Sequence, residues 1–281
     1  MPHPTEEGTT QVANGGTNGS HAHAAAIVAA SINEQAADIS RPALLTRATT
    51  SVVIPTLNEE RNLAWVLARL PGDLHEVIMV DGGSTDDTVE LAQTVYPEIR
   101  VVIEHRPGKG AALRAGFAEA TGDYVVMLDG DGSMNPSEIP RFIWALEHGC
   151  DLVKGSRFAP GGGTSDMTVI RRTGNGALMA AVNVLYRTRF SDLCYGYMAF
   201  RRDRLPLLRL DSDGFEIETE MVARAVIAGL RIGEVPSFEN ERGCGHSHLR
   251  PWRDGRRVLS TLLAERFVLP PTSVVVPGVV R

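Results

Sequence analysis

Four short apolar runs alternate with helical segments in the first half of this chain, and this alternation constrains the fold more than any other feature. The runs cover residues 51–55, 77–80, 101–103 and 124–128. One helix is expected after Asn58, which can cap it; a second starts at 84–86 and a third covers 111–120. A βαβαβαβ order predicts a mainly parallel central sheet with right-handed crossovers and flanking helices, a Rossmann-like α/β architecture.

The second half of the chain gives weaker signals that extend the same domain. Strands are expected at 151–153 and 232–235, and helices after Asn135 and at 169–186, 216–228 and 254–267. We therefore predict a single folded domain over residues 51–267. Residues 1–50 are rich in Gly, Thr and Asn and are expected to form a disordered tail. Residues 268–281 form an apolar tail, interrupted by prolines, that can pack on the body, on a second subunit of a homodimer or on lipid.

Composition excludes several classes of protein. The chain has 281 residues and a formal net charge of −6, which argues against nucleic acid as a partner. Its three cysteines are widely spaced and are expected to be reduced thiols of a cytoplasmic protein. No apolar run approaches the ~20 residues of a spanning helix, and no secretory signal is recognisable. A peripheral position at the inner face of the membrane stays open.

Two carboxylates follow the fourth apolar run, as Asp129-Gly130-Asp131. Open α/β sheets bind ligands at the carboxyl ends of their strands, so these side chains are expected at a binding site. Two neighbouring anions repel each other unless a positive charge lies between them. Hard oxygen ligands suit Mg²⁺ or Mn²⁺, and such an ion is well placed to hold a diphosphate.

Three upstream loops are expected at the same edge of the sheet. They are Pro55-Thr56-Leu57-Asn58-Glu59, Asp81-Gly82-Gly83-Ser84-Thr85-Asp86 and Pro107-Gly108-Lys109-Gly110. Asp81 can accept hydrogen bonds from a base or a ribose, or merely cap a turn. Lys109 can meet a phosphate, and its flanking glycines allow close backbone approach. Together the loops predict one cleft.

These loops and the Asp129-Gly130-Asp131 string resemble glycosyltransferase family 2. Within that family, Gly155-Ser156-Arg157, Glu234-Val235-Pro236, Arg242 and Gly245-His246-Ser247 resemble the dolichyl-phosphate mannose synthase branch. The resemblance implies a GT-A fold, a nucleotide-sugar donor, a divalent metal and inversion at the anomeric carbon. The branch favours GDP-mannose, with UDP-glucose next, and a polyprenyl phosphate as acceptor. The alternative acceptor is a hydroxyl of a small molecule or glycan.

The resemblance also implies roles for individual residues. The residues implied to contact the nucleotide sugar are Pro55, Leu57, Glu59, Asp81, Lys109, Asp129, Gly130 and Asp131. The implied metal ligands are Asp129, Asp131 and Ser133. The residues implied to contact phosphate or the acceptor are Arg157, Arg171, Arg172, Arg242, Ser247 and His248. Three positions depart from the family pattern. Gly82 replaces a second Asp, Ser133 replaces a Gln that helps to hold metal, and His248 replaces a Lys.

The acceptor decides whether a catalytic base is needed. A phosphate is already an anion and needs cations, whereas a hydroxyl needs a carboxylate base. Glu216, Glu218 and Asp192 are the candidates, although the two glutamates also suit the start of a helix. Preplaced cations, Arg157 among them, are expected to stabilise the negative charge that grows on the departing diphosphate.

Two segments have a second interpretation. Asp129-Gly130-Asp131-Gly132-Ser133 also resembles the nucleophile loop of haloacid-dehalogenase-like phosphatases, but that motif normally opens its domain. Arg250, Arg253, Arg256 and Arg257 form either a solvated helix face or a basic lid that contacts phospholipid.

Overall fold

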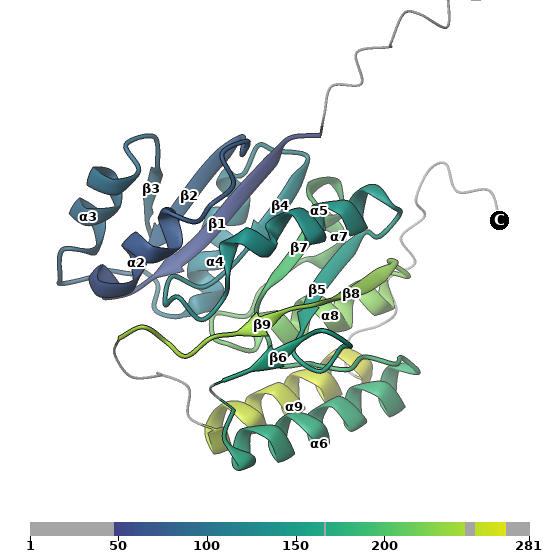
Figure 1. The fold of residues 1–281 in the computed structure, drawn as a ribbon. Helices are drawn as coiled ribbons and strands as arrows, with labels where there is room; N and C mark the ends of the chain where they lie inside the picture. The colour runs from purple at the N-terminus through teal and green to yellow at the C-terminus, as the bar shows by residue number, and fades with distance from the viewer. Residues whose placement is uncertain (1–47, 166, 245–250, 268–281) are drawn as a thin grey trace, which may run out of the picture. The chain divides into compact units, whose positions relative to one another are not determined.

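Residues 48–165, 167–244 and 251–267 are described by the computed structural model, and they contain a seven-stranded sheet with helices on both faces (Figure 1). The predictions for residues 1–47 and for the tail 268–281 lie outside the described residues. The mixed α/β architecture with a mostly parallel sheet is confirmed.

The sheet has the order β3-β2-β1-β4-β7-β5-β8. Its strands are β1 (Thr50–Thr56), β2 (Glu76–Asp81), β3 (Arg100–Ile103), β4 (Tyr124–Met127), β5 (Leu152–Ser156), β7 (Met198–Arg201) and β8 (Ile232–Pro236). A separate parallel pair is formed by β6 (Gly163–Thr164) and β9 (Phe238–Glu239).

Helices follow most strands along the chain. They are α2 (Glu60–Leu67), α3 (Thr88–Val95), α4 (Lys109–Glu119), α5 (Ile139–Glu147), α6 (Val169–Tyr186), α7 (Leu205–Leu208), α8 (Ile217–Ile227) and α9 (Pro251–Phe267), with 3₁₀ turns η1 (Pro136–Glu138) and η2 (Arg202–Arg204). The helix start after Asn135 is as predicted, because the Asn135 side chain accepts a hydrogen bond from the Ser137 amide.

Both faces of the sheet are buried, and successive residues of each strand enter opposite cores. Val53 packs in the core under α4, α6, α8 and α9, whereas its neighbours Val52 and Ile54 pack in the core under α2, α3 and α5. The sheet is therefore covered on both sides, as a parallel sheet requires.

The sequence analysis missed the two-residue strands β6 and β9 and also, within the main sheet, β7. This last strand runs antiparallel to both β4 and β5. The apolar run 197–200 lies between Gly196 and Arg201, but it is short and shows no alternation, so its pattern does not distinguish a strand from a helix. β7 lies between β4 and β5, so the loop that follows β5 and the Asp129 loop that follows β4 are one strand apart at the same edge of the sheet.

The predicted cap of α2 is wrong. Asn58 has a positive φ of 56°, and Glu59 occupies the cap position without a side-chain cap. The Asn58 side chain instead accepts a hydrogen bond of 2.8 Å from the Thr85 amide in the loop after β2. Asn58 thus ties two loops together at the edge of the sheet where a ligand site was predicted.

Candidate active site

A cavity of about 610 Å³ opens at the carboxyl ends of β1, β4 and β5, beside the amino ends of α4 and α8. Residues of α6, β9 and α9 complete its wall. Twelve of the predicted site residues line it, namely Pro55, Leu57, Glu59, Lys109, Asp129, Gly130, Asp131, Ser133, Arg157, Arg171, Glu218 and Arg242. Asp81, Arg172, Asp192 and Glu216 lie outside the lining. Ser247 and His248 are outside the described residues.

The two carboxylates after β4 each meet a cation. Asp129 Oδ1 lies 2.5 Å from Lys109 Nζ, and Asp131 Oδ2 lies 2.6 Å from a terminal nitrogen of Arg242. The other oxygen of Asp131 accepts hydrogen bonds from the Ser133 amide (2.9 Å) and hydroxyl (2.7 Å). Ser133 therefore orients Asp131, and its hydroxyl is turned towards that carboxylate.

Lys109 also bridges to a second carboxylate, with Nζ 2.6 Å from Glu218 Oε1. Loss of hydration raises the pKa of the Asp129 carboxyl to about 6, even with Lys109 beside it. Burial alone would lower the pKa of Lys109, but Asp129 and Glu218 together raise it above its ordinary value. Lys109 thus stays protonated and holds α8 to the loop after β4.

The glycines beside Lys109 serve the chain's own packing. A Cβ on Gly108 or on Gly110 would collide with the backbone of residues 212–214, and Gly108 has a φ of 116°. The Asp213 carbonyl accepts hydrogen bonds from the Gly110 (2.7 Å) and Ala111 (3.2 Å) amides at the start of α4. This start is thus capped by the protein's own backbone, and the close backbone approach that the glycines allow is that of residues 212–214.

Asp81 ends β2 as a buried carboxylate with one unused oxygen. Oδ2 accepts hydrogen bonds of 3.0 Å from the Gly83 and Ser84 amides. Oδ1 is buried and has no hydrogen-bond partner among the described residues. A buried acceptor without a partner is costly, so it marks a place where a donor group of a ligand fits.

Glu59 joins this side of the site to the carboxylates after β4. Its Oε2 accepts a 2.7 Å hydrogen bond from Asn62, and its Oε1 accepts a 3.2 Å bond from Arg242. Burial raises the pKa of the Glu59 carboxyl above its ordinary value. Arg242 therefore bridges Glu59 and Asp131.

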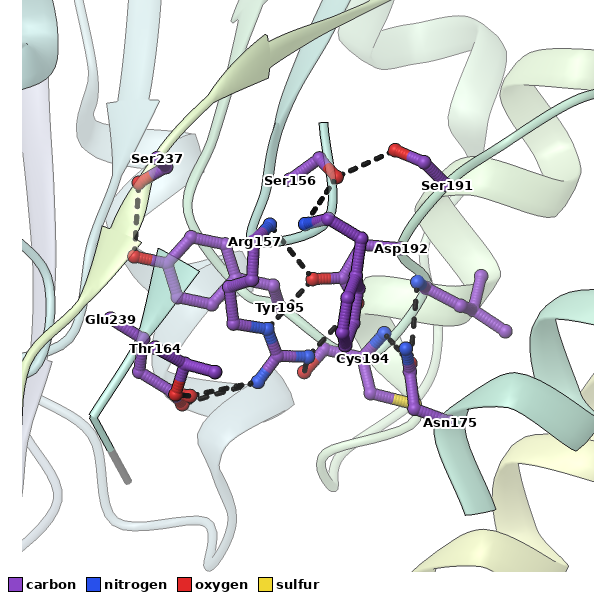
Figure 2. A network of polar contacts seen from close by, with 12 residues as sticks. Ser156, Arg157, Thr164, Asn175, Ser191, Asp192, Cys194, Tyr195, Ser237 and Glu239 are labelled. Atoms are coloured by element: carbon purple, nitrogen blue, oxygen red, sulfur yellow. Dashed lines mark hydrogen bonds and ion pairs between the residues drawn. The ribbon is translucent and has the colours of Figure 1, made fainter. Parts of the chain in front are cut away.

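Arg157 was predicted to contact phosphate, but the protein occupies all three of its side-chain nitrogens (Figure 2). It donates to both oxygens of Asp192, at 2.7 and 2.9 Å, and to both oxygens of Glu239, at 3.2 and 3.1 Å. The Cys194 carbonyl accepts a further bond of 3.1 Å, and the ring of Tyr195 lies 5.0 Å from the guanidinium carbon. Arg157 thus shapes the wall rather than offering a free donor.

Glu239 and Tyr195 are site residues that the sequence analysis missed. Glu239 accepts hydrogen bonds from Arg171 (3.2 Å) and from Thr164 (2.7 Å) and so holds Arg171 on the wall. Tyr195 shares a 3.1 Å hydrogen bond with Ser237, which donates to Glu138 beyond the Asp129 loop. No spacing in the sequence signals these contacts, because the partners lie far apart in the chain.

The three candidate bases have different surroundings. Glu218 faces the cavity. Asp192 is fully buried, is bound to Arg157 and does not line the cavity, which argues against the predicted role as a base. Glu216 has one buried oxygen without a partner among the described residues and is not part of the lining. Arg172 is exposed and lies over the ring of Phe158, with 5.7 Å between its guanidinium carbon and the ring centre.

The charges beside the Asp129 loop do not balance. Glu59, Asp129, Asp131 and Glu218 supply four negative charges, and Lys109 and Arg242 supply two positive ones. No group of three or more His, Cys, Asp or Glu side chains suited to a metal occurs in the part of the chain that the structure describes. Two carboxylates and an excess of two negative charges suit a divalent ion that takes its other ligands from substrate phosphates and water.

Comparisons with known proteins agree with this geometry. Residues 51–206 match the model of glycosyl transferase family 2. The glycosyltransferase AglJ of Haloferax volcanii is 36% identical over 210 residues, which are 73% of this chain and 67% of that protein. A dolichol-phosphate mannosyltransferase of Pyrococcus furiosus is 32% identical over 209 residues, or 71% of this chain and 59% of that protein.

A solved structure extends the comparison to the fold. Glucosyl-3-phosphoglycerate synthase of Mycobacterium tuberculosis, in complex with Mn²⁺, UDP and phosphoglyceric acid, superposes with a TM-score of 0.62 and 26% identity. The match covers 80% of this chain and 81% of that one. Because these relatives are glycosyltransferases, the interpretation of the Asp129 loop as the nucleophile loop of a phosphatase is wrong. The chain has the GT-A fold and belongs to glycosyltransferase family 2.

Proposed function

We propose that the protein is an inverting, metal-dependent glycosyltransferase that moves a hexose from a nucleotide sugar to a polyprenyl phosphate. The cavity carries this proposal, because it joins two chemically different halves. One half holds the charged groups Asp129, Asp131 and Lys109, which suit a sugar diphosphate. The other half is apolar and is formed by Met167, Ile170, Leu178 and Val258, with Arg171 beside it.

On the donor side, Asp81 offers its unpartnered buried oxygen to an N–H group of a nucleobase. Guanine and uracil both present such a group. GDP-mannose is favoured by the relation to a dolichol-phosphate mannosyltransferase. UDP-glucose is next, because the related synthase from Mycobacterium tuberculosis was solved with UDP-glucose.

Asp129 and Asp131 would hold a divalent Mg²⁺ or Mn²⁺, in keeping with the uncompensated charge around them. When bound, this ion supplies positive charge beside the donor diphosphate. Ser133 keeps Asp131 in place, and Lys109 and Arg242 add cations on the same side of the cavity. As the bond between the anomeric carbon and the diphosphate breaks, these fixed charges stabilise the leaving nucleoside diphosphate.

On the acceptor side, a phosphate oxygen forms the new bond to the anomeric carbon from the face opposite the leaving group. This attack inverts the configuration and needs no base, because the phosphate is already an anion. Arg171, held by Glu239, provides a cation at the boundary with the apolar half. The lipid chain then follows the apolar wall between α6 and α9.

A hydroxyl acceptor is the second candidate, and the position of Glu218 favours it. Glu218 faces the cavity and could take a proton from a hydroxyl. The related synthase with phosphoglyceric acid bound gives a precedent for a small acceptor.

The decisive experiment is a transfer assay with the full chain and Mn²⁺. GDP-mannose and UDP-glucose are each offered with a polyprenyl phosphate, with 3-phosphoglycerate and with a simple glycan. We expect a lipid-linked sugar from one donor and its loss with EDTA. Transfer only to a hydroxyl would overturn the proposed acceptor. If the acceptor is a hydroxyl, Glu218→Gln should abolish transfer, because the base is lost. If the acceptor is a phosphate, the same variant should retain transfer.

A further inference from the structure

The outer faces of α6 and α9 carry large apolar side chains in solvent. On α6, Val169 and Val184 are each 78% exposed. On α9, Leu259 is 40% exposed, Leu263 41% and Phe267 69%. The two helices pack against each other along one side of the domain (Figure 1). Exposed apolar side chains gathered on adjacent helices indicate a docking surface.

Their spacing places them in stripes. Leu259, Leu263 and Phe267 recur every four residues and share one face of α9 with Arg256. Val169, Ala177, Ala180 and Val184 lie along one face of α6. The outer face of α6 thus bears small and apolar residues where a solvated helix would carry charges.

The exposed charges on these two helices have one sign. Arg172 on α6 is exposed, as are Arg253, Arg256, Arg257 and Arg266 on α9. The acidic residues of α9, Asp254 and Glu265, are buried, and Glu265 is bound to Arg224 of α8. This face is therefore basic on a chain whose formal net charge is −6.

We propose that the α6–α9 face docks on an anionic lipid bilayer. Apolar stripes bordered by arginines are the pattern of helices that lie in a membrane interface, where the apolar side enters the lipid and arginines meet anionic headgroups. No helix among the described residues is long and apolar enough to cross a membrane. Docking by a surface fits that finding, and it holds whether or not the proposed acceptor is correct.

The test is co-sedimentation of the full chain with vesicles, without any sugar donor. Vesicles of phosphatidylcholine alone are compared with vesicles that also contain phosphatidylglycerol. Leu263→Glu with Phe267→Glu removes the apolar stripe, and Arg256→Gln with Arg257→Gln removes two charges. The matched controls are Ile103→Glu, an exposed apolar residue on β3, and Arg69→Gln, an exposed arginine after α2.

We expect binding to the anionic vesicles that weakens with salt. The double glutamate variant should bind about tenfold more weakly or worse. Each arginine removed should lower binding about fivefold on anionic vesicles only. The controls should bind like the wild type.

Two results would overturn the proposal: the wild type fails to sediment with anionic vesicles, or the face variants bind as well as the controls. If the wild type does not bind vesicles and Leu263→Glu with Phe267→Glu splits a dimer in light scattering, a second copy of the chain covers this face instead. Because the assay contains no donor, its outcome is independent of the transfer assay.

Discussion

The two sides of the cavity handle charge in opposite ways. On the side that we propose for the donor, Asp129, Asp131, Glu59 and Glu218 outnumber the cations that meet them. On the side that we propose for the acceptor, Arg157 is bound to Asp192 and Glu239, and Glu239 also binds Arg171, so that positive and negative charges match. On the first side carboxylates remain uncompensated, whereas on the second side each carboxylate already has a cation of the protein beside it.

This difference separates two uses of a carboxylate. Crowded and uncompensated carboxylates cost stability but can attract a cation with its diphosphate. Carboxylates in a saturated network fix the shape of a wall and bind nothing further. Substitutions on the donor side should therefore affect activity more than stability, and those in the Arg157 network should do the reverse.

The largest effect is expected at Asp131. Asp131→Asn should lower the transfer rate by ~10²–10³, because it removes a charge that holds the metal and diphosphate. The free energy of unfolding should change by less than ~1 kcal/mol, since the carboxylate lies in a region of excess negative charge. Steady-state kinetics and urea unfolding measure the two. Asp203→Asn, at an exposed ion pair, is the control and should change neither.

Asp192→Asn should show the opposite pattern. We expect a loss of ~3 kcal/mol in the free energy of unfolding at pH 7, because the buried Arg157 loses its main counter-charge while Glu239 remains. Urea denaturation measures it. A loss near zero would mean that the network does not fix the wall.

The pH dependence of Asp192 gives a second check. Burial alone would raise the pKa of this carboxyl, but the hydrogen bonds and charge of Arg157 hold it below its ordinary 3.8. A depressed folded pKa contributes stability that is complete above about pH 4 and is lost as the pH falls through the folded pKa. The gap between wild type and Asp192→Asn should therefore narrow below about pH 4.

Gly196→Ala tests whether the position of the Lys109–Glu218 ion pair matters to transfer. A Cβ at Gly196 would collide with Glu218 Oε1 and lie 3.0 Å from Lys109 Nζ. These atoms end flexible side chains, so the fold should survive while the Lys109–Glu218 pair moves away. We expect a roughly tenfold lower transfer rate, about 1.4 kcal/mol in the barrier. An unchanged rate would show that the position of this pair does not matter to transfer.

The smallest effect is expected at Gly176, the matched control in α6. A Cβ there meets nothing within 4 Å. Gly176→Ala should stabilise the fold by about 0.5–1 kcal/mol through helix propensity and leave the transfer rate unchanged. Thermal unfolding together with the rate assay checks this.

The donor side could be predicted from sequence because it is built from consecutive units. Each strand there ends in a polar loop, and the parallel arrangement alone brings those loops together. Asn58 was misassigned because an Asn can either cap a helix or bond a neighbouring loop, and only the position of Thr85 decides between them. The glycines beside Lys109 were predicted to allow close backbone approach, but the sequence does not say which backbone approaches, because residues 212–214 come a hundred residues later in the chain.

The acceptor side could not be predicted in the same way. The binding of Arg157 to Glu239 depends on β9 lying beside β6, which two-residue strands do not signal. Since the sequence does not reveal the pairing of β6 with β9, it does not show that the Arg157 side chain is already bound by carboxylates. The charge balance of the wall is a property of the folded chain.

The position of β7 between β4 and β5 affects how the chain folds during translation. β5 leaves the ribosome well before β7, yet β7 is its neighbour on the side towards β4. Until residues 198–201 are synthesised, the outer edge of β4 has no partner strand and β5 cannot join the first four strands. The nascent chain therefore exposes an open strand edge during translation, which is the stage at which it is most prone to aggregate and to need a chaperone.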